Sequence, residues 1–288
     1  MNLAEGAIGV MDSGVGGVSV LNALRFVLPY ENTVYLGDGL NSPYGRKSAD
    51  SVKRIVLENA ERLLEMGCKA LVLACNTATA VAVGEVRARY PEIPVVGLEP
   101  AVRPALRYAI EKGGDVLILA TEVTVAQPRF CSLCSEACRE LGGVWLGLDR
   151  SSLGRGEGRA PRVFSASAQG LVELIERGEG DSDECVEYLR RELGCFAGIK
   201  FSAVVLGCTH FPFARKAIAS ALGYPTSFFD GSLGAARQML RLLEKNKITR
   251  PHGFGESGWI RWCDTAERLG YAERFRICRR QNIELRTK

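Results

Sequence analysis

Two short stretches of the sequence place a cysteine where an apolar run stops. "LVLACNTATA" (71–80) and "VVLGCTHFPF" (204–213) each contain three aliphatic residues, a small residue and a cysteine, followed by Asn-Thr or Thr-His. In both stretches we expect the cysteine, Cys75 or Cys208, to lie where a strand gives way to a turn and a helix. A thiol at that place lies near backbone N–H groups and the positive end of a helix, and both favour its thiolate form.

Two equivalent thiols suggest a particular kind of chemistry. A free cysteine has a pKa of about 8.5, so a modest decrease makes its thiolate usable as a base near neutral pH. With one thiol on each face of a substrate, one removes a proton and the other delivers one, which inverts a stereocentre without a covalent intermediate or a cofactor. The alternative is that Cys75 and Cys208 are small hydrophobic side chains buried at strand ends. Their matched contexts and the polar residues that follow them favour the functional interpretation.

The first apolar segment also ends in polar residues, Asp12 and Ser13 of "MDSGVGGVSVL" (11–21). Glycines follow, but Ser19 stands where a dinucleotide fingerprint needs its third glycine, and a Walker lysine is missing. A carboxylate would repel a pyrophosphate, so the pair better suits the ammonium group of a ligand, and Asp12 could polarise a catalytic group. The alternative is a glycine turn capped by Asp-Ser.

Further candidates come from the loops after other apolar segments. Pro43, Tyr44 and Gly45 in "NSPYGRKS" could offer backbone N–H groups to a carboxylate, although many turns contain Pro and Gly. One of only two histidines, His210, follows Cys208 by two positions, which makes it a candidate proton partner that tunes the thiol rather than a structural side chain. In "ATEVTV", Thr121 and Thr124 could bind a carboxylate or merely cap a helix.

Ten cysteines raise the question of metal or disulfides. The segment "CSLCSEAC" places Cys131, Cys134 and Cys138 close together, and a C-x-x-C element can begin a zinc site. The nearby sequence offers neither a second pair nor a histidine, and the apolar spacing is that of a helix. We therefore expect structural, reduced cysteines and no metal site.

The elements that position these residues are short apolar strands alternating with amphipathic helices. The expected strands span 7–11, 32–38, 69–76, 94–99, 115–121, 143–149, 202–209 and 225–232. Near-continuous apolar strands between helices indicate an α/β fold with parallel sheets, in which ligands bind at the carboxyl ends of the strands. The repeated cysteine scheme suggests two related domains, with "GLEPAVRPAL" as a crossing between them. The stretches 152–161 and 252–258 suggest loops, the latter leading into a C-terminal helical tail.

Composition limits the class of protein. A chain of 288 residues with 47% hydrophobic residues can form two domains, and its net charge of +4 is too weak and dispersed to indicate nucleic acid or an anionic membrane as partner. Neither a signal peptide nor an apolar run of the ~20 residues that span a bilayer is evident. These features favour a cytoplasmic protein.

The quoted motifs occur along the chain together with "GDGLNSPYGRKS" and "VVGLEP". In these motifs and in their order, the chain resembles the glutamate racemases of the aspartate/glutamate racemase superfamily. The resemblance covers about residues 8 to 213. It implies cofactor-independent interconversion of L- and D-glutamate, supplying D-glutamate for peptidoglycan. It also implies two similar open-sheet α/β domains with the active site in the cleft between them, and a homodimer. With the C-terminal segment returning to the first domain, we expect domains at 1–99 plus 231–288 and at 100–230.

The resemblance also implies roles for individual residues. Cys75 would deprotonate D-glutamate and Cys208 would deprotonate L-glutamate, with Asp12 and His210 assisting the thiols. The residues implied to hold the substrate are Ser13, Tyr44, Gly45, Asn76, Thr77, Thr124 and Thr209, and the helix of "GLVELIERG" offers Glu176 for the family's usual glutamate.

The sequence departs from the family pattern at several places. Ala168-Gln169 replaces an expected Cys-Pro, Gln127 replaces an expected Ser, and the stretch from 246 onward matches poorly.

Two other functions remain as alternatives to glutamate racemisation. An aspartate racemase would share the paired cysteines, and a non-catalytic amino-acid binder would need neither the two thiols nor His210.

Overall fold

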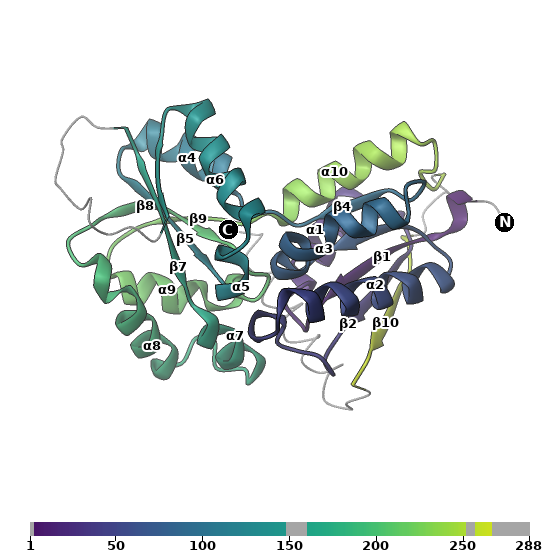
Figure 1. The fold of residues 1–288 in the computed structure, drawn as a ribbon, viewed down its shortest axis with the longest axis horizontal. Coiled ribbons are helices and arrows are strands. Elements are labelled where there is room, and N and C mark those ends of the chain that lie inside the picture. Colours follow the sequence, from purple (N-terminus) through teal and green to yellow (C-terminus); the bar gives the residue numbers. More distant parts are fainter. Residues whose placement is uncertain (1–2, 148–159, 252–256, 267–288) are drawn as a thin grey trace. The chain divides into compact units, whose positions relative to one another are not determined.

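The computed structural model describes residues 3–147, 160–251 and 257–266. The chain divides into two compact units, Met1–Glu99 with Gly231–Lys288 (unit 1) and Pro100–Asp230 (unit 2) (Figure 1). Within the described residues, each unit is built on one five-stranded sheet whose paired strands are all parallel. The α/β class and the two similar open sheets expected from the sequence are thus confirmed.

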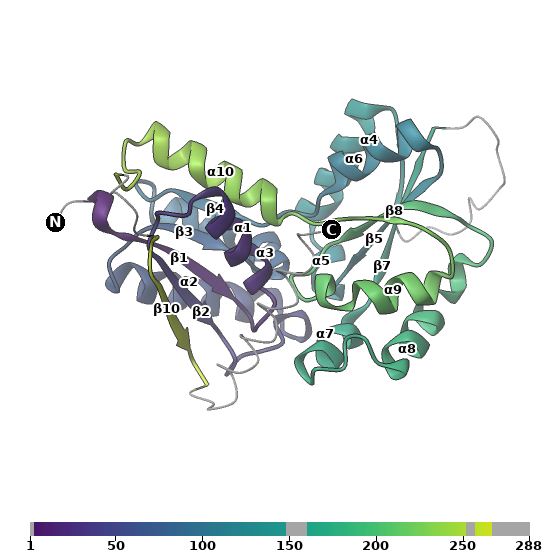
Figure 2. The same cartoon turned by 180° about the vertical axis from the view of Figure 1, so that it is seen from behind.

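The sheet of unit 1 has the strand order β10-β2-β1-β3-β4. One of its faces carries the packed pair α1 and α10, and the other carries α2 and α3 (Figures 1 and 2). The strands are β1 (Ala7–Asp12), β2 (Thr33–Gly37), β3 (Cys68–Leu73), β4 (Val95–Gly97) and β10 (Ile260–Asp264). The helices are η1 (Leu3–Glu5), α1 (Val18–Val27), η2 (Tyr44–Arg46), α2 (Ala49–Glu65), α3 (Asn76–Arg89) and α10 (Ser232–Lys245).

The sheet of unit 2 has the strand order β6-β7-β5-β8-β9. Helices α4 and α6 pack together on one face, and α7, α8 and α9 lie on the other (Figures 1 and 2). The strands are β5 (Asp115–Ala120), β6 (Val144–Gly147), β7 (Arg162–Ser167), β8 (Phe201–Leu206) and β9 (Ser227–Phe229). The helices are α4 (Val102–Lys112), α5 (Glu122–Val125), α6 (Pro128–Leu141), α7 (Gln169–Glu176), α8 (Asp183–Leu193), η3 (Gly194–Phe196), η4 (Phe211–Ala214) and α9 (Arg215–Leu222).

The two sheets repeat one design down to its irregularities. In each, the central strand pairs with the cysteine-bearing strand, β1 with β3 and β5 with β8. In each, this pairing shifts register after the first residue of the central strand, between Ala7 and Ile8 and between Asp115 and Val116. Beyond the two strands, Ala74 N donates to Met11 O and Gly207 N donates to Leu119 O. The residue that immediately precedes each cysteine is therefore fixed in the same way.

Local sequence explains where the helices begin and which face they bury. Ser48 caps α2 by accepting from Ser51 N at 3.3 Å, and residues spaced by three or four, such as Val52, Val56 and Ala60, form its buried face. Between β1 and α1, a Cβ on Gly17 would lie 2.6 Å from the Asp12 Cβ. Only glycine therefore lets this helix start so close to the carboxylate.

Two strands were not expected from the sequence. β7 lies in "RVFSAS", and β10 lies in the stretch expected to lead into a helical tail. That tail expectation is wrong for 260–264, which pair in parallel with β2 at the edge of the sheet. Most of the expected loops at 152–161 and 252–258, and the tail beyond 266, lie outside the described residues.

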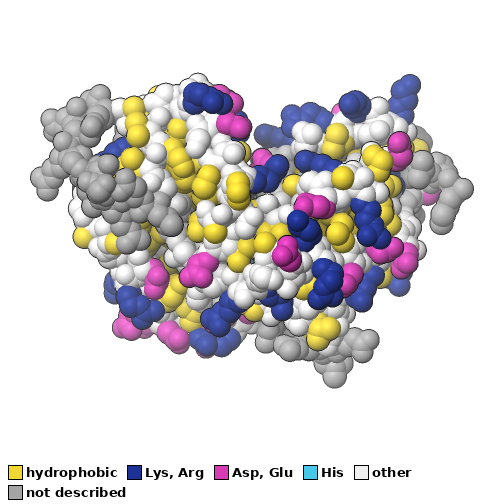
Figure 3. Space-filling model, in the orientation of Figure 1, with side chains coloured by type: hydrophobic (Ala, Val, Ile, Leu, Met, Phe, Trp, Pro, Cys, Tyr) yellow, Lys and Arg dark blue, Asp and Glu magenta, His cyan; other side chains and the backbone are white. Residues whose placement is uncertain are grey.

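In the part of the chain that the structure describes, no helix combines the length and apolar character needed to span a bilayer. On the face drawn in Figure 3, basic and acidic side chains are interspersed rather than gathered into areas of one sign. This distribution agrees with the dispersed charge of the sequence.

Candidate active site

Cys75 is the N-cap residue of α3. It follows β3 with extended backbone (φ −90°, ψ 125°), and its Sγ accepts from Ala78 N at 3.5 Å. Its side chain also lies 3.7 Å from the Ser13 Oγ, and the residue is only 5% exposed. Because the free N–H groups of the helix start carry partial positive charge, this place stabilises a thiolate. We refer to Asp12, Ser13, Tyr44, Cys75, Asn76 and Thr77 as the Cys75 half-site.

Asp12 and Ser13 form the turn after β1. Asp12 is fully buried, and its Oδ2 accepts from Gly14 N at 2.9 Å, which is the turn-capping role considered as the alternative. Ser13 is also buried and is the hydroxyl in contact with Cys75. The structure therefore brings the first and third strand ends of unit 1 together.

Tyr44 is held in place by groups that sequence reasoning did not select, Asp38 and Asn59. Its hydroxyl donates to the Asp38 Oδ2 at 2.6 Å, and the Asn59 Nδ2 donates to the same oxygen at 3.0 Å. Burial, then the charge of Asp38 and its hydrogen bond, and in part the Cys75 charge, hold the pKa of Tyr44 well above its usual value. Tyr44 therefore stays a neutral phenol near the thiol.

The short turn η2 follows Pro43, which has extended backbone. Inside it, Arg46 N donates to Pro43 O and Lys47 N donates to Tyr44 O. The N–H groups of Tyr44 and Gly45 come first in the turn and have no carbonyl within it to accept from them. They fit the expected carboxylate contact, although both residues are buried.

Asn76 and Thr77 occupy the first turn of α3 and are 4% and 3% exposed. The Asn76 Oδ1 has no hydrogen-bond partner among the described residues. A buried amide oxygen without a hydrogen-bond partner is costly. The Asn76 Oδ1 therefore marks a place where a ligand could donate a hydrogen bond.

Cys208 lies at the equivalent strand end of unit 2, but its neighbours differ. The His210 Nδ1 lies 3.7 Å from the Cys208 Sγ, and the His210 Nε2 lies 2.6 Å from the Glu176 Oε1. Burial lowers the pKa of His210, but the hydrogen bonds to Cys208 and Glu176 outweigh it and raise the pKa well above its usual 6.5. A protonated imidazole therefore lies beside the Cys208 sulfur. We refer to Thr121, Thr124, Glu176, Cys208, Thr209 and His210 as the Cys208 half-site.

Thr121 and Thr124 meet each other at the end of β5. Thr121 is the N-cap of α5 and accepts from Thr124 N at 3.3 Å, and the two Oγ1 atoms lie 2.8 Å apart. The capping alternative considered for these residues is therefore present in the structure. Thr209, the residue after Cys208, is also buried, with 3% of its surface exposed.

Two of the three clustered cysteines belong to the core of unit 2. Cys134 and Cys138 lie on the buried face of α6 among Phe130, Ala137 and their neighbours, whereas Cys131 is exposed. Burial raises the pKa of Cys138 to about 11 and raises that of Cys134 as well, so neither is poised as a thiolate. Among the described residues, no group of three or more His, Cys, Asp or Glu side chains could hold a metal ion.

Comparison with known proteins agrees with these features. Residues 29–239 match the model of the Asp/Glu/hydantoin racemase family. A curated glutamate racemase of Clostridium acetobutylicum is 39% identical over 86% of this chain and 88% of its own length. The solved glutamate racemase of Francisella tularensis, in complex with D-glutamate, is 25% identical with a TM-score of 0.76, over 96% of this chain and 94% of its own.

The Escherichia coli glutamate racemase, solved with L-glutamate and the activator UDP-MurNAc-Ala, is 28% identical with a TM-score of 0.74. The alignment covers 96% of this chain and 95% of the Escherichia coli chain. The family match spans well over half of the chain, and these relatives align along most of it. The chain therefore belongs to the Asp/Glu/hydantoin racemase family and is an enzyme of the isomerase class.

Proposed function

We propose that this protein interconverts L- and D-glutamate without a cofactor, using Cys75 and Cys208 as the two proton-transfer groups. The observation that carries the proposal is that both thiols follow the same strand of a repeated sheet design. Both are buried, and each lies beside a group that stabilises a thiolate. Relatives solved with D-glutamate and with L-glutamate support this choice of substrate.

The Cys75 thiolate removes the α-proton of D-glutamate while Cys208, as a thiol, protonates the opposite face; for L-glutamate the roles reverse. No covalent bond to sulfur forms, and each turnover exchanges which thiol carries the proton. Asp12 and His210 assist the thiols.

The difficult step is formation of the carbanion, because an amino-acid α-proton is far less acidic than a thiol. Aligned N–H groups and hydroxyls can stabilise the developing charge where water is excluded. The first N–H groups of η2 and α3, the orphaned amide oxygen of Asn76 and the hydroxyls of Ser13 and Thr77 offer such contacts to the carboxylates and the ammonium. Thr121, Thr124, Thr209 and Glu176 are the corresponding groups of unit 2.

The test is circular dichroism at a wavelength sensitive to glutamate. Reduced enzyme is incubated with L-glutamate or with D-glutamate, without added cofactor, and both signals should decay to zero. Cys75→Ser and Cys208→Ser should each abolish racemisation in both directions, whereas the control Cys131→Ser, an exposed cysteine of α6, should retain it. Near-normal racemisation by either of the first two variants would exclude a two-thiol mechanism.

A second readout separates two bases from one. In D2O, the first product molecules should carry deuterium while the remaining substrate carries little, because the group that delivers the proton is not the one that removed it. Equal deuterium in both would indicate a single base. If neither glutamate signal moves, the same assay with aspartate tests the aspartate racemase alternative, and inactivity there favours an amino-acid binder.

We further infer that the enzyme works in the cytoplasm as a homodimer, supplying D-glutamate for peptidoglycan. The cysteines among the described residues are all free, and the mechanism needs reduced thiols, which the cytosol maintains. Sedimentation of the reduced protein tests the dimer, and dependence of growth on added D-glutamate after depletion tests the role in the cell wall.

A further inference from the structure

Helix α7 carries Glu176, the partner of His210, yet it begins without the usual support. Its N-cap residue is Ala168, which makes no side-chain hydrogen bond to the helix. The family pattern that the sequence resembles has Cys-Pro here, and a proline at the first helical position would remove one donor that needs a partner. With Ala168-Gln169 instead, the free N–H groups at the start of α7 require an acceptor from elsewhere.

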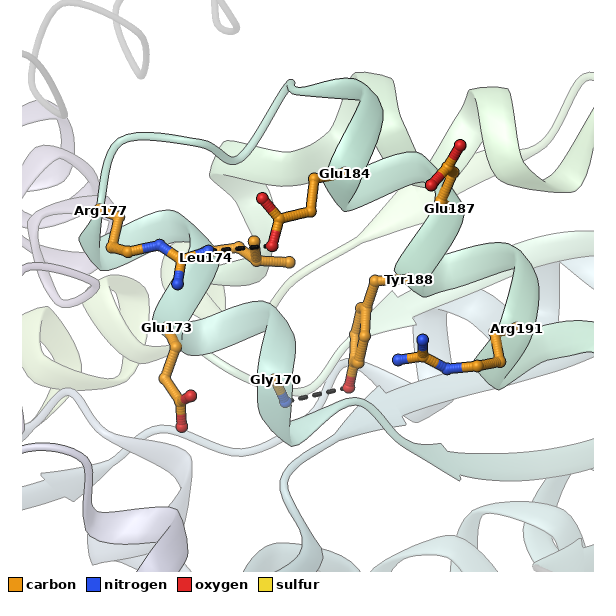
Figure 4. Close-up of a pocket in the computed structure, with 8 residues that line it drawn as sticks. All are labelled: Gly170, Glu173, Leu174, Arg177, Glu184, Glu187, Tyr188 and Arg191. Atoms are coloured by element: carbon orange, nitrogen blue, oxygen red, sulfur yellow. Dashed lines mark hydrogen bonds and ion pairs between the residues drawn. The ribbon is translucent and has the colours of Figure 1, made fainter.

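That acceptor comes from the neighbouring helix α8. The Tyr188 hydroxyl accepts from Gly170 N at 2.9 Å, and Figure 4 shows the ring reaching from α8 to the first turn of α7. Burial raises the pKa of Tyr188, and the N–H groups of Gly170 and Leu171 lower it only in part. The side chain is therefore a neutral phenol whose oxygen takes the place of an N-cap side chain.

Gly170 and Tyr188 fit each other. A Cβ on Gly170 would lie 2.8 Å from the Cε2 and 3.0 Å from the Cζ of Tyr188, closer than a carbon side chain tolerates. On α8 the Arg191 guanidinium lies over the same ring, 5.4 Å from its centroid. The glycine thus provides the space that lets the phenol reach the backbone of α7.

The other end of α7 reaches the proposed catalytic thiol. Glu176 is the last residue of this eight-residue helix, and its Oε1 lies 2.6 Å from the His210 Nε2. The His210 Nδ1 in turn lies 3.7 Å from the Cys208 Sγ. Since a helix of this length is about 12 Å long and internally hydrogen-bonded, a displacement of its first turn moves its last residue as well.

We propose that Tyr188 is a positioning residue for Cys208: its hydroxyl caps α7 from α8 and thereby holds Glu176 against His210. The inference rests on the proposed function, and it deepens it by adding Tyr188 and Gly170 to the residues that set the state of the thiol. The ionisable groups that act on His210 are Glu176 from α7 and Cys208 from its own loop.

The test reads the protonation of His210 directly. The chain contains only two histidines, so histidine-labelled protein gives two NMR titration curves, and His252→Asn assigns them. In Tyr188→Phe, which keeps the ring and removes the acceptor, we expect the pKa of His210 to fall by about half a unit or more. We also expect kcat to fall roughly threefold to tenfold with little change in KM.

Tyr224→Phe is the matched control. Tyr224 is another half-buried tyrosine of unit 2 whose hydroxyl accepts from a backbone N–H, that of Phe201 at 3.1 Å, but it contacts no part of α7 in this way. Its loss should leave the His210 titration unchanged. Gly170→Ala displaces the Tyr188 ring while keeping its hydroxyl, and it should lower the pKa of His210 as Tyr188→Phe does. If Tyr188→Phe does not fold, the titration of Gly170→Ala tests the proposal in its place.

An unshifted His210 in folded Tyr188→Phe, or an equal shift in Tyr224→Phe, overturns the proposal. Because the titration needs no turnover, its outcome is independent of racemisation. If the wild type fails to racemise glutamate while Tyr188→Phe still shifts His210, the proposed function is wrong and the link from Tyr188 to His210 stands.

Discussion

The two half-sites occupy the same position in two copies of one sheet design, yet they surround their thiols differently. Cys75 caps a fourteen-residue helix and touches the Ser13 hydroxyl, so a helix terminus and a neutral side chain are among its contacts. Cys208 has a protonated histidine backed by Glu176. Topology thus sets where a thiol lies, and side chains from neighbouring elements decide how its charge is stabilised.

This difference has a consequence for mutation. The Cys208 half-site places the titratable pair His210 and Glu176 beside its thiol, whereas Ser13 offers Cys75 a neutral hydroxyl and the Ala78 N–H remains after any side-chain substitution. We therefore expect substitutions of His210 and Glu176 to cost more than substitution of Ser13.

Among substitutions of residues other than the two cysteines, the largest effect is expected for His210→Asn. Loss of the imidazolium removes the charge that stabilises the Cys208 thiolate, and kcat should fall by roughly 10²- to 10⁴-fold, the range for acid–base groups. Racemisation rates with both enantiomers, beside near-ultraviolet circular dichroism to confirm folding, measure this. If kcat falls no more in His210→Asn than in Ser13→Ala, the two half-sites do not differ in their dependence on side chains.

Glu176→Gln should have the next largest effect, because it keeps a hydrogen-bonding group and removes the charge. Since Glu176 contributes to the raised pKa of His210, its loss lowers that pKa, and the imidazole loses its proton at lower pH. The alkaline limb of the kcat/KM profile should move to lower pH, with a decrease of roughly tenfold, or about 1.4 kcal/mol, at the optimum. If the alkaline limb of the Glu176→Gln profile stays where it is in the wild type, then the deprotonation of His210 does not set that limb.

Ser13→Ala should cost less, roughly threefold to tenfold in kcat, because Ser13 offers Cys75 only a neutral contact at 3.7 Å while the Ala78 N–H remains. Ser19→Ala is the matched control, since Ser19 is equally buried in the same unit but bonds only the Gly16 carbonyl. Equal losses in the two variants would assign the effect to packing.

The smallest effect concerns stability. The pKa of His210 is raised in the folded protein, so its contribution is fully present below about pH 6.5 and is lost as pH rises through the folded pKa. Relative to His210→Asn, the wild type should lose on the order of 1 kcal/mol of unfolding free energy over that range. Denaturant unfolding at a series of pH values checks this, and parallel curves would contradict it.

The sequence predicted the fold where strands are buried on both faces. β3 and β8 read as aliphatic runs because helices cover both sides of each sheet. β7 was missed because "RVFSAS" mixes serines with its apolar residues, and β10 because "IRWCD" is an edge strand with charged and half-buried side chains. Edge strands need fewer apolar residues, so periodicity signals them weakly.

The candidate residues that end strands could be chosen from sequence because parallel strands bring their carboxyl ends together. Residues that act from elsewhere could not. Asp38, although it directly follows β2, was not selected, and Asn59 of α2 meets it across 21 positions. Tyr188 lies 18 positions from Gly170, and only the packing of α8 on α7 brings them into contact. These links are tertiary and leave no local pattern.

The edge strand β10 also bears on how the chain is made. Unit 2 is one continuous segment, 100–230, whereas the sheet of unit 1 receives β10 from residues 260–264. During synthesis, domains that are complete fold first, and an unpaired strand edge is exposed until its partner arrives. A ribosome-bound chain can therefore form the surroundings of Cys208 while β2 still lacks β10, and the sheet that carries Cys75 is complete only after residues 260–264 have been made.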